Sequence, residues 1–247
     1  MSTGASAAIL GTCRARARPH SQRQETRTIP TRPDDARGAG NPRARQRYSD
    51  AARAAADPLV RGLVRAGVTP NAITIFGFAG AVATAVLVGF QQWIAAGIVF
   101  VIGSVSDMFD GSVARMTGKA TRFGAFLDSS LDRLGEGFVL GGIGVALARE
   151  GSTWAVGMTF AALAGSFLVS YTRARAEGLG VDSNKGGLMS RTERLVLVGA
   201  GIFFGGVGPV LEIAVTILAV GTLVTVAQRL SYVHSTLRDA DGTPEDR

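Results

Sequence analysis

Four aspartates and one arginine are the residues of this chain whose types and spacing are best suited to chemistry. Asp107 and Asp110 are three residues apart and Asp128 and Asp132 are four apart, so each pair lies on one face of a helix. Four converging carboxylates repel one another unless cations lie between them. Ligand sets made only of oxygen suit hard cations such as Mg2+, Mn2+ or Ca2+. The pattern therefore predicts a divalent-metal site, beside which Arg115 supplies a cation for a phosphate.

The surroundings of these aspartates are almost entirely apolar. Carboxylates at membrane depth are costly, and their default interpretation is functional. A membrane cation transporter is an alternative from another class, but it predicts acidic residues spread over several spans at mid-depth. A membrane prenyltransferase also uses Mg2+ on a diphosphate, but we expect its two Asp motifs in distant loops and more spans. Here the aspartates cluster at one side of two adjacent spans with Arg115 beside them, which favours phosphate chemistry.

The elements that position these aspartates are predicted from hydropathy. The chain has 247 residues, of which 47% are hydrophobic, and apolar runs of about 20 residues recur, the length needed to cross a bilayer. We expect an all-α integral membrane protein in which an amphipathic juxtamembrane helix, with Leu59, Val60, Leu63 and Val64 opposite Arg61 and Arg65, precedes six transmembrane helices. We place the six spans at residues 71–90, 92–110, 122–148, 152–174, 192–206 and 209–232.

The domain organisation follows from composition. Most of the net charge of +7 belongs to residues 1–57, where eleven arginines face five acidic residues. Residues 1–45 are poor in large apolar side chains, so we expect a disordered Arg-rich tail, solvated rather than bound to nucleic acid. Residues 46–237 form the predicted membrane domain, and residues 238–247 a polar C-terminal tail.

The charges of the loops predict the orientation. The connections at 89–92, 149–152 and 205–209 carry one arginine among them. The Asp motif, both tails and most of the basic residues fall on the other side. By the positive-inside rule, we expect both termini and the active site on the cytoplasmic face of a multi-pass plasma-membrane protein. Trp93 and Trp154 fall at the opposite interface, as an aromatic belt requires.

Eight residues together fill a longer signature, D-x2-D-G-x2-A-R-x8-G-x3-D-x3-D, without a substitution: Asp107, Asp110, Gly111, Ala114, Arg115, Gly124, Asp128 and Asp132. On this pattern the chain resembles the CDP-alcohol phosphatidyltransferase family. The resemblance implies an enzyme that displaces CMP from a CDP-linked lipid when an alcohol attacks the β-phosphoryl group. It also implies two Mg2+ ions, with Mn2+ as an alternative, and the metal ligands Asp107, Asp110, Asp128 and Asp132. Asp132 is in addition the implied catalytic base.

The resemblance also implies a binding site for CDP-diacylglycerol. Its residues are Asn71, Thr74, Gly111, Arg115 and Thr121. Two of them have simpler explanations, since Asn71 is suited to a helix start and Thr74 to packing between membrane helices.

A second polar cluster lies where the fourth predicted span ends and the fifth begins: Ser170, Arg173, Arg175, Arg191 and Arg194. Arginines concentrated beside a metal site are typical of a binding site for a phosphate monoester. The positive-inside bias alone also places arginines at this side of the membrane.

The segments S-Y-x-x-A-R-A-E and R-x-E-R-L, with F-G-A-F-L-D-S-S-L-D-R, resemble the phosphatidylinositol phosphate synthases of actinobacteria over about residues 50–237. This implies that the second cluster holds myo-inositol 1-phosphate, that the products are phosphatidylinositol phosphate and CMP, and that the enzyme is a homodimer. Because glycerol 3-phosphate is also a phosphate monoester, a phosphatidylglycerol phosphate synthase remains the alternative.

Overall fold

The structure is a computed structural model, and it describes residues 58, 60–118, 120–182 and 187–241. The Arg-rich tail expected at residues 1–45 lies outside these residues, as does most of the predicted C-terminal tail. Within the helices, six residues are described by their backbone alone: Met108, Asp110, Gly111, Arg115, Ala240 and Asp241.

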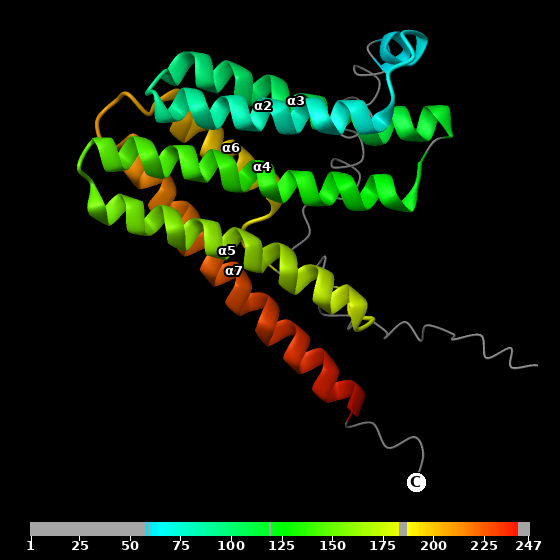
Figure 1. Cartoon of the computed structure of the whole chain (residues 1–247). Coiled ribbons are helices and arrows are strands. Elements are labelled where there is room, and N and C mark those ends of the chain that lie inside the picture. Colours follow the sequence, from blue (N-terminus) through cyan, green and yellow to red (C-terminus); the bar gives the residue numbers. More distant parts are fainter. Residues whose placement is uncertain (1–57, 59, 119, 183–186, 242–247) are drawn as a thin grey trace, which may run out of the picture.

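The described part of the chain is all-helical, which confirms the all-α part of the predicted fold class (Figure 1). Each predicted span corresponds to one helix: α2 Pro70–Gly89, α3 Trp93–Thr117, α4 Arg122–Arg149, α5 Thr153–Gly178, α6 Arg191–Phe203 and α7 Val210–Asp241. The end of α7 differs most, at residue 241 where we expected 232, and α3 ends at residue 117 where we expected its span to end at 110. We ended that span at the charges that mark a membrane boundary, whereas the helix continues for about two more turns.

Local sequence cues fix where the helices begin. Thr69 caps α2 and Pro70 takes its first position, where a missing N–H costs nothing. The hydroxyl of Thr121 accepts a hydrogen bond from the backbone N–H three residues later at the start of α4. At the start of α6, the backbone N–H of Ser190 donates to the carboxylate of Glu193 at 2.7 Å. These caps set the register in which each helix presents its polar residues.

Within the described ranges of the chain, four helices are long and apolar enough to cross a membrane: Pro70–Gly89, Trp93–Ala114, Thr153–Gly178 and Val210–Asp239. The other two helices differ for physical reasons. Charged residues interrupt the first half of α4, and α6 has 13 residues, about 20 Å of helix against a hydrocarbon core of about 30 Å. These two helices carry much of the polar chemistry described below, and the count of six spans stays a prediction.

The six helices close into a ring. Helix α2 packs on α3 and α4, α4 on α5, α5 on α7, α7 on α6, and α6 on α3. Small residues allow the backbones to approach closely. A Cβ on Gly142 of α4 would lie 2.8 Å from the Cα of Ala85 in α2, and one on Gly80 of α2 would lie 3.4 Å from the Cα of Gly103 in α3. The ring therefore surrounds a common interior that all six helices can reach.

The two ends of the ring differ. The connections α2–α3, α4–α5 and α6–α7 lie together at one end, at the left of Figure 1. The last turns of α3 and α5 and the first turns of α4 and α6 lie toward the other end. The predicted aspartates and arginines therefore share one end of the molecule.

A short helical segment, residues 60–65, precedes α2. Val60 is buried against Ile73 and Val113, and Leu63 and Val64 pack on the same cluster. The apolar face predicted for this segment thus covers the start of α2 and the last turns of α3. Its location at a membrane surface stays a prediction.

The chain leading into α6 is held by side chains of α7. The backbone N–H of Leu188 donates to Oε1 of Gln228, and that of Met189 donates to Oγ1 of Thr225, both at 2.9 Å. A Cβ on Gly187 would lie 2.6 Å from a methyl carbon of Thr225. This close contact fixes the start of α6 beside the middle of α7.

Candidate active site

Three of the predicted aspartates converge. Asp107 of α3 and Asp128 and Asp132 of α4 each offer a carboxylate oxygen, and these oxygens lie within 4.8 Å of one another. Hard divalent cations prefer such all-oxygen donor sets, so the three residues fit a Mg2+ or Mn2+ ion. Three other predicted site positions lie outside the described side chains: Asp110, Gly111 and Arg115.

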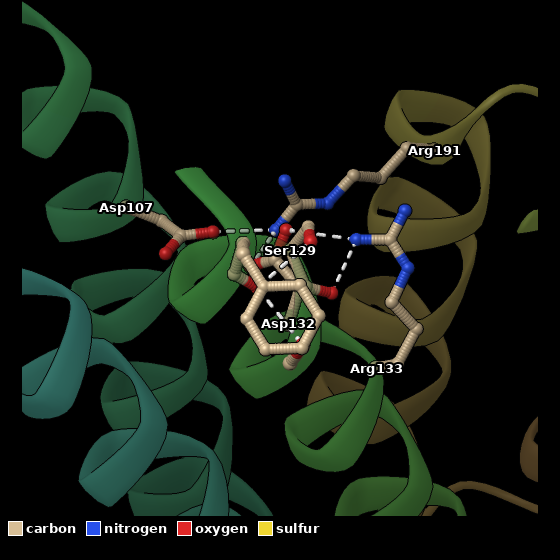
Figure 2. A network of polar contacts seen from close by, with 7 residues as sticks. Asp107, Ser129, Asp132, Arg133 and Arg191 are labelled. Atoms are coloured by element: carbon tan, nitrogen blue, oxygen red, sulfur yellow. Dashed lines mark hydrogen bonds and ion pairs between the residues drawn. The ribbon is translucent and has the colours of Figure 1, made fainter. Parts of the chain in front are cut away.

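Arg191 faces this group from the first residue of α6. Its Nη2 donates to Oδ2 of Asp107 at 2.5 Å and to Oδ1 of Asp132 at 2.6 Å. Figure 2 shows the guanidinium between the two carboxylates. Arg133 lies on the other side of Asp132, with 3.7 Å between Nη1 and Oδ2. Arg191 thereby joins α6 to α3 and α4 and offsets part of the repulsion among the aspartates.

We expect an Arg191→Ala variant to lose stability when divalent ions are absent, because the carboxylates of Asp107 and Asp132 then lack their facing cation. In EDTA the unfolding temperature should fall by about 3–6 °C, the equivalent of one or two kcal/mol for a chain of this size. Added Mg2+ should reduce the difference in unfolding temperature between the variant and the wild type. Thermal unfolding in detergent measures both, with Arg175→Ala as the control arginine. Equal unfolding temperatures for Arg191→Ala and the wild type in EDTA would show that Arg191 does not stabilise the carboxylates.

A single cavity of about 160 Å³ adjoins these carboxylates and is lined by all six helices. Its polar side chains are Thr74, Ser104, Asp107, Asp132, Arg133, Glu136, Ser170, Arg173, Arg191, Arg194 and Arg229. The carboxylates and the arginines therefore share one space, although they come from helices far apart in sequence.

Two arginines of the cavity are deeply buried. Arg194 is 4% exposed, and its Nε donates to Oε1 of Glu136 at 3.0 Å. Arg229 of α7 is 9% exposed, and its Nη1 donates to the backbone carbonyl of Val169 in α5 at 2.5 Å. Two buried guanidinium groups that line one cavity are suited to binding an anion there.

The predicted acceptor residues do not all reach the cavity. Ser170, Arg173, Arg191 and Arg194 line it, whereas Arg175 is exposed and is not among the lining residues. Two residues along a helix correspond to about 200° of rotation. Arg175 therefore lies on nearly the opposite side of α5 from Arg173.

Of the predicted nucleotide residues with described side chains, Thr74 lines the cavity, whereas Asn71 and Thr121 do not. Thr74 is buried and lines it, and its hydroxyl donates to the backbone carbonyl four residues earlier at 3.2 Å. Asn71 and Thr121 are exposed near Gly124, since a Cβ there would lie 3.3 Å from Oδ1 of Asn71 and 3.0 Å from Oγ1 of Thr121. The signature glycine at position 124 thus keeps space open between two predicted ligands of the nucleotide.

Sequence reasoning assigned no site role to four polar residues of the cavity: Ser104, Arg133 and, with the largest consequence, Glu136 and Arg229. Glu136 follows Asp132 by four residues and continues the face that carries both Asp128 and Asp132. Arg229 is a lone charge in an apolar part of α7, which we attributed to the charge bias of membrane loops. In both cases the signal was a charged residue in an otherwise apolar stretch of helix.

Comparison with known proteins gives concordant results. The family model of CDP-alcohol phosphatidyltransferases matches residues 67–227. The phosphatidylinositol phosphate synthase of Mycobacteroides abscessus is 42% identical over 186 residues, covering 72% of this chain and 83% of that protein.

Two solved structures share the fold. The crystal structure of Mycobacterium tuberculosis phosphatidylinositol phosphate synthase with CDP-DAG bound has a TM-score of 0.67 and 35% identity, covering 77% of this chain and 96% of that one. The crystal structure of the same enzyme in complex with manganese and citrate has a TM-score of 0.65 and 34% identity, covering 77% of this chain and 91% of that one. With its complete Asp signature, the chain therefore belongs to the CDP-alcohol phosphatidyltransferase family and is a transferase of phospholipid biosynthesis.

Proposed function

We propose that this enzyme transfers the phosphatidyl group of CDP-diacylglycerol to myo-inositol 1-phosphate, giving phosphatidylinositol phosphate and CMP. The hydroxyl oxygen of the acceptor attacks the β-phosphorus, the bond from that phosphorus to the bridging oxygen breaks, and CMP leaves with the bond's electrons. The hydroxyl proton passes to a base. In-line placement of the two substrates contributes much of the rate in reactions of this kind.

The observation that carries this proposal is the shared cavity, in which the carboxylates of Asp107 and Asp132 adjoin the buried guanidinium group of Arg194. A diphosphate donor requires metal-binding carboxylates, and a phosphate-bearing acceptor requires a separate cationic site. Acceptors without phosphate, such as serine or free inositol, leave the arginines unexplained. The relatives support the choice of inositol phosphate, since the similar proteins of Mycobacteroides abscessus and Streptomyces avermitilis are named phosphatidylinositol phosphate synthases.

The metal ligands are Asp107, Asp110, Asp128 and Asp132, and we infer that they hold two Mg2+ ions, with Mn2+ as a substitute. Bound there, the ions neutralise the diphosphate and stabilise the leaving oxygen of CMP. Manganese in the relative's crystal supports this assignment.

The chain's own residues supply the remaining functions. Asp132 takes the proton of the acceptor hydroxyl, since it lies both in the metal group and on the cavity wall. Arg191 and Arg194, with Ser170 and Arg173, bind the phosphate of the acceptor.

The CDP end of the donor lies toward the start of α2 and α4. There it contacts Asn71, Thr74, Gly111, Arg115 and Thr121. The space kept open at Gly124 supports this placement.

The proposal extends to the membrane. We infer six spans, including the charged α4 and the short α6, in the plasma membrane, with the Asp end of the ring on the cytoplasmic side. The three short connections at the opposite end of the ring (Figure 1) carry one arginine among them, and this scarcity of basic residues supports the orientation. We also infer a homodimer, on the resemblance to the family.

The test is CMP release by the purified protein with CDP-diacylglycerol and Mg2+, comparing myo-inositol 1-phosphate with glycerol 3-phosphate. We expect turnover with the inositol phosphate only. Turnover with glycerol 3-phosphate only would overturn the choice of acceptor while leaving the metal and donor assignments in place. Turnover with free inositol would remove the reason for an acceptor-phosphate site.

A further inference from the structure

One acidic residue of the cavity has no part in the chemistry described so far. Glu136 of α4 lines the cavity one turn beyond Asp132. Among the described residues, the carboxylates that converge on a metal position are Asp107, Asp128 and Asp132, and Glu136 is not one of them. A carboxylate on the wall of the acceptor cavity repels a phosphate monoester unless its charge is offset.

The charge of Glu136 is offset by Arg194. The guanidinium Nε and the carboxylate Oε1 are 3.0 Å apart, and the two side chains are only 5% and 20% exposed. A buried ion pair of this kind is costly to break from one side, because the partner is left as an uncompensated charge. Arg194 is therefore constrained by Glu136 in a way that a surface arginine is not.

The atom used in this contact determines where the rest of the guanidinium points. Because the group is planar and rigid, fixing Nε fixes the plane and the direction of both Nη groups. Within the described part of the chain, Nε is the atom of Arg194 that makes a hydrogen bond to protein, and the residue lines the cavity. Its two Nη groups are thus available to a bidentate oxyanion such as a phosphate.

A neighbouring pair shows the contrast. Arg173 also lines the cavity, and its Nε donates to Oε1 of Glu177 at 2.9 Å. In that pair the side chains are 49% and 50% exposed, so water and salt weaken the interaction. Glu177 does not line the cavity, and it provides a matched control of the same residue type and partner type.

We propose that Glu136 is a positioning residue for the acceptor: it holds Arg194 with both Nη groups directed at the acceptor phosphate. The inference deepens the proposed function and rests on its placement of the acceptor in this cavity. Glu136 itself touches no reacting atom, and its effect on turnover passes through Arg194.

The test compares Glu136→Gln, which keeps the size and one hydrogen-bond acceptor but loses the charge, with Glu177→Gln. For Glu136→Gln we expect the KM for the acceptor to rise about tenfold, as for the loss of a charge-assisted contact, while the KM for CDP-diacylglycerol changes less than about twofold. For Glu177→Gln, neither constant should change by more than about twofold. A purely structural role for Glu136 predicts equal effects on both substrates, and that result would overturn the proposal.

A double-mutant cycle tests whether Glu136 acts through Arg194. Glu136→Gln should add less than about twofold to the acceptor KM of Arg194→Ala, since the residue it positions is already gone. Multiplicative effects would show an independent role and overturn the proposal. If Glu136→Gln fails to fold, Glu136→Asp carries the same test. It keeps the charge with a shorter reach, so its acceptor KM should lie between those of the wild type and Arg194→Ala.

The failure of this inference is separable from failure of the proposed function. The kinetics use whichever phosphate monoester the wild type accepts, so a wrong acceptor identity leaves the test intact. A second measurement, protection against thermal unfolding in detergent by inorganic phosphate, needs no turnover. We expect protection in the wild type and in Glu177→Gln, and its loss in Glu136→Gln. Equal protection in all three proteins would overturn the role of Glu136, whatever the acceptor proves to be.

Discussion

Replacing Asp128 with asparagine should abolish CMP release while leaving the protein folded. Asp128 contributes an oxygen to the converging carboxylates, and an amide lacks the negative charge that a hard cation requires. Mutation of residues that only hydrogen-bond to metal ligands already lowers metal affinity or activity by about 10–100-fold. For loss of a ligand itself, we expect the rate of CMP release to fall by more than about 100-fold at saturating concentrations of both substrates. Initial rates of CMP release over a range of Mg2+ concentrations measure the effect.

The matched control for this variant is Glu150→Gln. Glu150 is an acidic residue of the opposite end of the ring, where its carboxylate accepts a hydrogen bond from Gln91 at 2.9 Å. Glu150→Gln should release CMP at a rate within about twofold of the wild type. Mn2+ should raise the unfolding temperature of the wild type and of Glu150→Gln but not that of Asp128→Asn. Normal turnover by Asp128→Asn would remove this residue from the metal site.

Replacing Arg194 with alanine should produce the second largest effect, and it should be confined to one substrate. Hydrogen bonds to charged groups contribute about 1.5–3 kcal/mol, so loss of both Nη groups should raise the KM for the acceptor by about 10–100-fold. The KM for CDP-diacylglycerol should change much less. Steady-state kinetics with each substrate varied in turn separate the two constants.

Arg175→Ala is the control for Arg194→Ala, because the same residue type is removed at a position that is exposed and does not line the cavity. It should alter neither KM by more than about twofold. Equal increases in both constants for Arg194→Ala would place that residue outside the acceptor site. A larger effect for Arg175→Ala than for Arg194→Ala would contradict our placement of the acceptor.

Helical periodicity predicted that Asp128 and Asp132 share one face of α4, and the family resemblance predicted that Asp107 of α3 joins them, as it does. The same periodicity separates Arg175 from Arg173 by about 200°, although a cluster defined by sequence proximity included both. Spacing within a helix was therefore reliable, whereas proximity along the chain was a poor guide to a shared site.

Contacts between helices could not be predicted in this way. The bridge from Arg191 to Asp107 and Asp132 depends on α6 lying beside α3, and the pair of Arg194 with Glu136 depends on the closed ring. Hydropathy identified α4 by the apolar run in its second half. The charged residues of its first half carry more information about the site, but the sequence allowed us to assign a role to only some of them.

The entry of the chain into α6 has a consequence for how two dissimilar substrates meet. The backbone N–H groups of Leu188 and Met189 donate to Gln228 and Thr225 of α7, which precede the buried Arg229 by one and four residues. Irregular backbone is tolerated at membrane depth only where it is buried in protein or lines a water-filled space. If all six helices span the bilayer, α6 is shorter than the hydrocarbon core is thick. We infer that the irregular chain before α6 occupies the remaining depth. We expect water to reach the arginines of the cavity from this side. Under the proposed function, a water-soluble sugar phosphate would then enter from the aqueous phase while its lipid co-substrate remains anchored in the hydrocarbon.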